Sequence, residues 1–402
     1  MVETEHPRLL LHQFISPDLC KELEFIHKSC STTGYRPNVF STTLSHLIAT
    51  NSSHLIIPFV PIRERLKEKV EEFFGCEFEL FIEFTGLISW TRGASIGWHS
   101  DDNRPYLKQR HFAAVCYLNR YGIDFEGGVF HFQHGKPASV APMTGDVLIY
   151  TADSRNIHSV DEIIDGERLT LTLWFTRDAS HDEDAKLISF LSSTLLDSSD
   201  TNINHLLPSP ASNNMYWFPP DQASNHQSGF DLRCARIYIA GYDIYCSRDK
   251  SYSLADDLSD SFVELLNEPL QLAWRNQLLK KEFVNILHAL QVLQFYYWKH
   301  TEWQPSDYKA NNDDVVQMSE SQLERIQSLK LQFVRNYRSV EAIFPDRTGG
   351  ISLLEQSIDW ASFSAANVAW EAYTSKLHQE ILNSFPEWKM HNSMFSNPST
   401  ES

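Results

Sequence analysis

The amino-acid sequence predicts an α+β fold, in which an antiparallel β domain with flanking helices is followed by a mostly α-helical region. Between residues 79 and 176, short segments rich in β-branched and aromatic residues alternate with turn signals, which is typical of antiparallel strands. After residue 274, apolar residues recur at helical spacing. The stretch between them is rich in Ser, Asn, Asp and Pro. We therefore expect a β domain over residues 1–191, a linker over 192–229 and a helical domain over 230–402.

The length, composition and charge of the chain limit the classes of protein to consider. Its 402 residues leave room for two domains, since one domain takes roughly 150 residues. A hydrophobic fraction of 42% is enough for packed cores. The net charge of −18 would repel phosphate backbones and anionic membrane surfaces, so we expect neither nucleic acid nor a membrane as a partner. No apolar run approaches the ~20 residues that a membrane helix needs.

The cysteines and the first residues indicate a reducing compartment. The six cysteines include no Cys-x-x-Cys pair, which fits buried free thiols. The opening segment MVETEHPRLLLHQF has no basic stretch followed by a hydrophobic core, so a secretory signal is not expected. The cytoplasm or the nucleus is therefore the expected location.

Two helices are predicted before the strands begin. Ser16 can cap a helix that starts at Pro17, and leucine and isoleucine then recur at helical spacing to about residue 29. A second amphipathic stretch covers residues 62–74 and ends at Gly75, which suits a left-handed helix cap. Both helices would flank the β domain.

Five segments then follow the strand pattern, and three later segments follow the helix pattern. The strands are predicted at residues 79–90, 112–119, 129–133, 146–151 and 168–176, which together indicate an antiparallel barrel or sandwich. The later helices are predicted at residues 274–297, 323–344 and 351–382. No fixed-period repeat is present, so a solenoid is not supported.

Two histidines and one aspartate form a candidate metal site. His99 and Asp101 are two residues apart after a strand-like segment, and on an extended backbone such side chains point to the same side. His158 follows after strands that would return the chain to the same end of the β domain. Two imidazoles and one carboxylate are the ligand set that suits non-haem Fe(II) and leaves coordination positions open.

A regular alternation after His158 places an arginine near this site. In the segment from Arg168 to Trp174, the side chains of Arg168, Thr170, Thr172 and Trp174 share one face of a strand. A guanidinium beside a metal ion is a receptor for a carboxylate, because its planar donors bind both oxygens. This pattern favours Arg168 as an anion-binding residue over a surface charge.

Other polar residues near these motifs are interpreted more simply. Strand histidines are more often hydrogen-bonded fillers than ligands, which applies to His111, His131 and His134. Asp102 and Asn103 adjoin the metal motif and could orient its ligands. Arg92 and Arg104 are expected as exposed loop charges, and either could face an acidic substrate.

Seven short motifs occur in the order seen in a known family. They are His99-Ser100-Asp101, Tyr117-Leu118-Asn119, Glu126-Gly127-Gly128, Gly145-Asp146, His158-Ser159-Val160, Gly166-Glu167-Arg168 and Leu173-Trp174-Phe175-Thr176. Over about residues 9–190, the chain resembles the Fe(II)/2-oxoglutarate-dependent dioxygenases of the prolyl hydroxylase type, most of all the prolyl 3-hydroxylase (leprecan-like) catalytic domain.

The resemblance implies a fold and a set of site residues. It implies that residues 1–191 form a double-stranded β-helix, also called a jelly roll, with oxygenase activity. His99, Asp101 and His158 would bind iron, and Arg168 would bind the distal carboxylate of 2-oxoglutarate. Tyr117 would donate its hydroxyl to that carboxylate, and Thr172 and Trp174 would line the co-substrate pocket. The implied cofactors are Fe(II), 2-oxoglutarate, O2 and ascorbate.

The implied reaction is the hydroxylation of a side chain, prolyl by resemblance, in a protein or peptide, with release of succinate and CO2. Two alternatives stay open. In the first, the β domain retains a metal without catalysis and the helical half recruits a protein partner. In the second, the same ligands hold Zn(II) in a hydrolase, which has no use for Arg168. The oligomeric state is left open.

Overall fold

The computed structural model describes the β domain almost completely and parts of the C-terminal half. The described residues are 5–30, 33–36, 38–49, 52–196, 291, 294–299, 320 and 360–396. The helix predicted at 323–344 lies outside the described residues, as does nearly all of the predicted linker. Most of the helix predicted at 274–297 also lies outside them. The helix predicted at 351–382 is described only from residue 360 onward.

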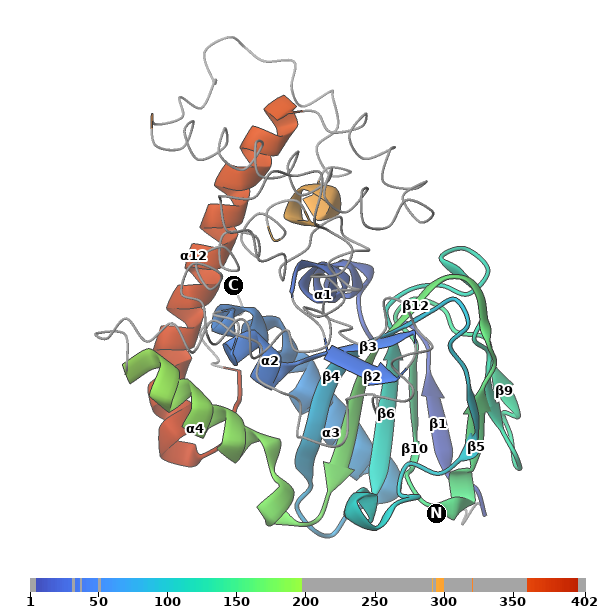
Figure 1. Cartoon of the computed structure of the whole chain (residues 1–402). Coiled ribbons are helices and arrows are strands. Elements are labelled where there is room, and N and C mark those ends of the chain that lie inside the picture. Colours follow the sequence, from blue (N-terminus) through green and yellow to red (C-terminus); the bar gives the residue numbers. More distant parts are fainter. Residues whose placement is uncertain are drawn as a thin grey trace, which may run out of the picture.

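Two antiparallel sheets form the β domain, as predicted (Figure 1). The strand order of the larger sheet is β1 (Arg8–Leu11), β10 (Val147–Thr151), β6 (Phe112–Tyr117), β12 (Ile163–Thr176), β4 (Phe81–Thr91), β3 (Val39–Thr43) and β2 (Thr33–Arg36). A further short strand, β7 (Phe125–Gly127), pairs with β12 outside this order. The smaller sheet has the order β5 (Ile96–His99), β11 (His158–Val160), β8 (Phe130–Phe132), β9 (Ser139–Val140).

Strand β12 is the centre of the larger sheet and separates two hydrophobic cores. It pairs with β4 on one side and with β6 on the other, so that Leu171 lies opposite both Leu87 and Cys116. Its odd-numbered residues from 169 to 175 are apolar and belong to the core beneath the helices. The even-numbered residues from 168 to 174 line a cavity on the opposite face. The alternation predicted for this segment is therefore confirmed.

Helices cover the face of the larger sheet that lies away from the smaller sheet (Figure 1). They are α1 (Pro17–Ser29), α2 (Leu44–Ala49), η1 (Ser53–Phe59), α3 (Val60–Phe74) and α4 (Glu183–Leu196). Helix α12 (Trp360–His391) packs against η1 and α4. Three short 3-10 turns lie elsewhere: η2 (Pro105–Leu107), η3 (Ser154–Asn156) and η4 (Ala179–His181). Within the described ranges, none of the helices is both long enough and apolar enough to cross a membrane.

The two helices predicted before the strands are confirmed. At α1, the Ser16 hydroxyl accepts a hydrogen bond from the backbone N–H of Leu19 at 3.3 Å, which caps the helix as expected. Helix α3 starts at Val60 rather than at residue 62, because η1 runs directly into it. It ends at Gly75, whose φ of 60° is the left-handed cap conformation.

The C-terminal residues that the structure describes share one core with the β domain. Residues from α12 and the turn after it are buried in the same cluster as α1, α3 and the outer face of the larger sheet: Trp370, Leu377, Ile381, Trp388 and Met394. Phe295 and Tyr296 belong to this cluster as well. In addition, α4 ends at Leu196, so the predicted linker begins inside a helix. Among the described residues, the C-terminal side chains therefore pack in the core of the β domain, and residue 191 lies within α4.

A buried group of charges joins the same elements. Nη2 of Arg63 on α3 donates to Asp184 at 2.6 Å and to Glu183 at 3.1 Å, and its Nε donates to Thr85 of β4 at 2.9 Å. The second oxygen of Asp184 accepts the backbone N–H of Met394 at 2.8 Å. Burial raises the pKa of Glu183 to about 7, against the opposing effect of Arg63. This network links α3, β4, α4 and the residues that follow α12.

Candidate active site

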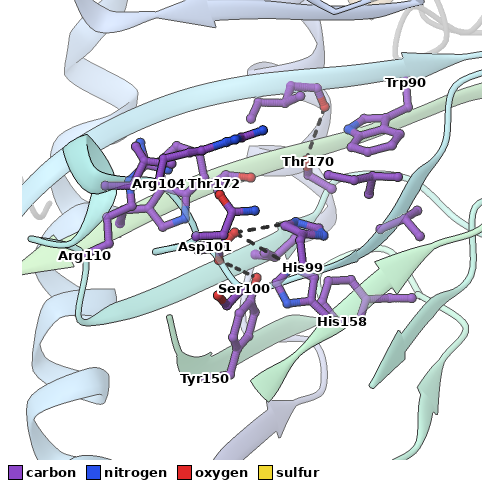
Figure 2. A pocket seen from close by; sticks show the side chains of 18 of the residues that line it. Trp90, His99, Ser100, Asp101, Arg104, Arg110, Tyr150, His158, Thr170 and Thr172 are labelled. Carbon is purple, nitrogen blue, oxygen red and sulfur yellow. Dashed lines mark hydrogen bonds and ion pairs between the residues drawn. The ribbon is translucent and has the colours of Figure 1, made fainter. Parts of the chain in front are cut away.

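The three predicted metal ligands meet between two paired strands. His99 ends β5, His158 begins β11, and the two residues lie opposite each other in the register. Asp101 is in the turn after β5, and its Oδ1 lies 3.9 Å from Nε2 of His99 and 3.8 Å from Nε2 of His158. The three ligand atoms are all within 4.8 Å of one another. Figure 2 shows the three side chains converging.

Both imidazoles are oriented with Nε2 free. Nδ1 of His99 lies 2.8 Å from the carbonyl oxygen of Gly97, and Nδ1 of His158 lies 2.9 Å from that of Asn156. A carbonyl oxygen can only accept, so Nδ1 carries the proton in each ring and Nε2 presents its lone pair to Asp101. This is the arrangement in which histidines bind metal ions.

The protonation states of the ligands also suit a metal ion. Burial lowers the pKa of His158 to about 4, so that its imidazole is neutral at pH 7. Burial acts to raise the pKa of Asp101, but the electrostatic effects of the neighbouring His158, His99 and Arg110 and the hydrogen bond from Tyr150 lower it below the ordinary value. Two imidazoles and one carboxylate fit Fe(II) and leave one face of the ion open.

Tyr150 of β10 holds the aspartate in place, and sequence reasoning missed it. Its hydroxyl donates to Oδ2 of Asp101 at 3.0 Å, and both side chains are buried. Because Oδ2 is occupied in this way, Oδ1 is the oxygen directed toward the two histidines. No motif marks Tyr150, because its contact with Asp101 depends on the placement of β10 beside β6.

The Tyr150→Phe variant keeps the buried ring and removes only this hydrogen bond. We expect its affinity for Co(II), a redox-inert substitute for Fe(II), to fall by about 10- to 100-fold, the usual cost of removing a partner of a metal ligand. Isothermal titration with Co(II) measures this effect. The control is Tyr106→Phe, which changes a tyrosine that is 60% exposed at the cavity rim. Equal Co(II) affinities of the Tyr150→Phe variant and the unmodified protein would contradict the assigned role.

A cavity of about 290 Å³ extends from the ligands between the two sheets. Its walls include the predicted residues Arg168, Thr172 and Trp174, all on β12. Thr170 also lines it and donates its hydroxyl to the carbonyl oxygen of Ile88 at 3.2 Å (Figure 2). A cavity of this size, apolar in part and with a few convergent polar groups, is typical of a small-molecule site.

Arg168 is buried in this cavity, and the described residues provide no counter-ion for it. It is 3% exposed and forms no ion pair with any residue in the described ranges. Its guanidinium lies 5.7 Å from the ring centre of Trp90 and 5.1 Å from that of Tyr117. A Cβ on Gly128 would lie 3.1 Å from Cδ of Arg168, so a larger residue would crowd this side chain. A buried charge is costly when unpaired, so this pocket is suited to an anion.

Two further buried polar atoms lack partners beside the cavity. Within the described part of the chain, the Tyr117 hydroxyl and Nε1 of Trp174 form no hydrogen bond. Burial raises the pKa of Tyr117, and the neighbouring Arg168 opposes this increase. Tyr117 does not line the cavity itself, but its ring contacts the Arg168 guanidinium. Trp174, which lines the cavity, therefore keeps a donor available for a ligand, whereas the Tyr117 side chain lies beside Arg168 rather than on the cavity wall.

The other polar residues considered in the sequence analysis are not metal ligands in this arrangement. His131 pairs with Asp161 at 2.7 Å outside the cavity, and neither His111 nor His134 lines it. Asp102 accepts from Lys108 at 2.7 Å and does not contact the metal ligands. Asn103 does line the cavity.

Sequence reasoning also missed Arg110 and Glu83. Arg110 lines the cavity, and its guanidinium lies 3.6 Å from the ring centre of Trp174. Its Nε donates to Glu83 of β4 at 2.8 Å, so its charge is neutralised. Arg104, expected as an exposed loop charge, is exposed but lines the cavity. Only the fold brings these residues to the site.

Comparisons with known proteins agree with this geometry. Residues 85–176 match the family model of the 2OG-Fe(II) oxygenase superfamily. Prolyl 3-hydroxylase 1 of Gallus gallus is 26% identical over 220 residues, which cover 44% of this chain and 30% of that protein. The 2-oxoglutarate and iron-dependent oxygenase domain-containing protein 3 of Rattus norvegicus is 28% identical over 128 residues, which cover 30% of this chain and 41% of that protein.

Among solved structures, a prolyl-4-hydroxylase from Pseudomonas putida is 17% identical and matches with a TM-score of 0.35, covering 43% of this chain and 94% of that chain. A score of this size does not by itself show a shared fold. The family model therefore matches residues 85–176 as a 2OG-Fe(II) oxygenase domain, and prolyl 3-hydroxylase 1 is among the relatives that the chain resembles in sequence. The chain spans less than a third of the length of the prolyl 3-hydroxylase 1 that it matches.

Proposed function

We propose that this chain uses Fe(II), O2 and 2-oxoglutarate to hydroxylate a side chain of a protein or peptide, with proline as the first candidate. One observation carries the proposal. The His99, Asp101 and His158 ligand atoms and the unpaired Arg168 guanidinium lie in one cavity. The relatives named prolyl 3-hydroxylase support proline as the residue to test first.

The charges of the assembled site favour this co-substrate. Fe(II) carries +2, Asp101 −1 and 2-oxoglutarate −2, which leaves −1, and the +1 of Arg168 balances it. Neutrality matters here because an uncompensated buried charge costs several kcal/mol. Zn(II) hydrolysis with the same ligands would leave Arg168 unpaired. Binding of 2-oxoglutarate therefore explains why Arg168 is buried, whereas Zn(II) hydrolysis does not.

In this proposal the two sheets correspond to the double-stranded β-helix of the family, with the ligands held between them. His99, Asp101 and His158 would hold the iron, which when bound supplies the redox chemistry that activates O2. Arg168 would bind the distal carboxylate of 2-oxoglutarate through paired hydrogen bonds, and the Tyr117 hydroxyl would donate to the same group. Thr172 would lie along the co-substrate.

The apolar walls of the cavity would exclude water from the reacting groups. Trp174 and Phe130 both line it and are almost fully buried. One oxygen atom of O2 enters the substrate as a hydroxyl group, and the other enters succinate, while the carboxylate next to the keto group leaves as CO2. Exclusion of water limits side reactions during this sequence.

The test supplies the purified chain with Fe(II) and 2-oxoglutarate under anaerobic conditions and then admits O2. We expect succinate formation, and peptides that gain the mass of one oxygen atom, when candidate proline peptides are present. Ascorbate, the remaining implied cofactor, is included and omitted in parallel. The control is Asp101→Ala, which removes one of the ligands and should abolish both signals.

Two results would speak against the proposal. If the unmodified chain forms no more succinate than Asp101→Ala with any candidate peptide, the chain is not an active oxygenase. If it then still binds Co(II) tightly, the alternative is favoured, in which the β domain retains a metal and the helical half recruits a partner.

A further inference from the structure

We propose that the site selects peptides with a carboxylate side chain close to the residue that is hydroxylated, and that Arg104 binds this carboxylate. The inference rests on the proposed function and extends it to the class of substrate. It depends on the position of Arg104 in the cavity and on the charges of the residues around it.

Arg104 reaches the cavity from the segment that follows the metal ligand Asp101. It directly precedes η2 (Pro105–Leu107), and this segment leads on to β6. Both Arg104 and the following Tyr106 line the cavity, and both are exposed, so they lie at its open rim. Figure 2 shows Arg104 among the lining groups together with Arg110 and Thr172. An entering peptide would therefore meet Arg104.

The other cations near the rim already have a partner or a role. Arg110 is paired with Glu83 at 2.8 Å, and Lys108 is paired with Asp102 at 2.7 Å. In the proposed function, the positive charge of Arg168 neutralises the site that holds Fe(II) and 2-oxoglutarate. Arg104 forms no ion pair and no side-chain hydrogen bond with the residues that the structure describes. One positive charge therefore remains for the substrate.

The overall charge of the chain makes this cation significant. With a net charge of −18, the molecule as a whole repels acidic peptides. A free guanidinium at the rim of the cavity is a local exception to that repulsion. Low-dielectric walls around a cavity strengthen such a local charge. An acidic residue would therefore be favoured close to the reacting side chain and disfavoured elsewhere on the peptide.

The observations favour a carboxylate over a phosphate group. One guanidinium matches one carboxylate in charge and binds both of its oxygens. A phosphate carries close to two negative charges at pH 7. Since the nearby Arg110 and Lys108 are already paired, a phosphate would remain partly uncompensated.

The experiment uses a pool of random synthetic peptides that also contains phosphoserine. The full chain oxidises the pool with Fe(II), 2-oxoglutarate and O2, and mass spectrometry identifies the oxidised peptides. We expect Asp or Glu to be enriched at one position near the oxidised residue. In single peptides, replacing that Asp with Asn should lower kcat/KM by about 2- to 5-fold, the effect of an ion pair at a solvent-exposed rim.

Variants at two exposed arginines test the assignment to Arg104. Arg104→Gln should raise KM for the acidic peptide with little change in kcat. The reason is that the contact stabilises the bound substrate and the transition state equally. Arg104→Glu should change the preference from Asp to Lys at the same position. The control Arg92→Glu alters an exposed arginine that does not line the cavity and should leave the preference unchanged.

Each other outcome overturns the inference at an identifiable step. Oxidised peptides with no acidic preference, or the same preference in Arg104→Glu, would show that Arg104 does not select the substrate. Enrichment of phosphoserine instead of Asp or Glu would overturn the choice of a carboxylate. Weaker 2-oxoglutarate binding in Arg104→Gln would assign Arg104 to the co-substrate. If no peptide is oxidised although 2-oxoglutarate binds, the proposed function fails, and this inference with it.

Discussion

Replacing Arg168 with glutamine is expected to weaken 2-oxoglutarate binding by about 30-fold or more. Removing one member of a buried charged pair costs at least about 2 kcal/mol, and each 1.4 kcal/mol is about tenfold in affinity. Arg168 is 3% exposed and has no ion-pair partner in the described structure, so water cannot easily replace it. Isothermal titration of the Co(II)-loaded protein with 2-oxoglutarate measures the change.

The affinity for Co(II) itself should remain nearly unchanged in Arg168→Gln, because His99, Asp101 and His158 supply the ligand atoms without it. The control is Arg120→Gln, which alters an exposed arginine in the loop after β6. It should affect neither titration. If Arg168→Gln loses Co(II) and 2-oxoglutarate binding together, Arg168 supports the fold rather than the co-substrate.

Replacing Trp388 with alanine is expected to lower the free energy of unfolding by about 3–5 kcal/mol, the usual cost of truncating a buried tryptophan. Trp388 on α12 is 1% exposed and donates Nε1 to the carbonyl oxygen of Phe395 at 2.7 Å. It is one of the largest fully buried side chains among the described residues. Urea unfolding measures the change in stability.

The matched control lies on the same helix. Met390 is 66% exposed, so Met390→Ala should change the free energy of unfolding by no more than about 0.5 kcal/mol. Because Trp388 shares a core with the larger sheet, 2-oxoglutarate binding should be lost at the same urea concentration as the folded structure. Binding that survives the unfolding of α12 would show that the helix is a separate unit.

The shared core also affects where the chain can be truncated. A fragment that ends near residue 191 would expose the surface that Trp370, Leu377 and Trp388 cover. It would also remove the backbone N–H of Met394 from Asp184, a partner of the buried Arg63. Deletion of the C-terminal half would then damage the β domain itself. A test for partner recruitment should instead change exposed residues of α12.

Much of the candidate site was predictable from the sequence because it depends on local geometry. The period of two along a strand placed Arg168, Thr172 and Trp174 on one face, and the structure has them along one cavity. His99 and Asp101 also point to one site, but Asp101 lies in the turn after β5, so the strand period does not account for its position. Helix capping at Ser16 and the helix end at Gly75 are likewise decided within a few residues of chain. Local features of this kind are expected in any fold that contains the same strand or helix.

Most of the short strands escaped prediction because they offer too few residues for a periodic pattern. β7 and β11 each have three residues and β9 has two, whereas β8, also of three residues, lies within the strand predicted at 129–133. They become strands through pairing with neighbours that are distant in sequence, as His158 does with His99. Strand β1 is similar, since its register against β10 brings together residues 8–11 and 147–150.

By itself, the sequence determined which residues can share a strand face or a helix turn, and this was enough to bring forward the metal ligands and Arg168. Only the tertiary structure decided which groups meet across elements. It placed the Tyr150 hydroxyl on Asp101 and paired Arg110 with Glu83, and it put Arg104 at the rim with no ion-pair partner among the described residues. It also buried Trp388 in a core whose other members come from far earlier in the chain. The physical reason is that such contacts depend on register and packing between distant segments, which no local pattern encodes.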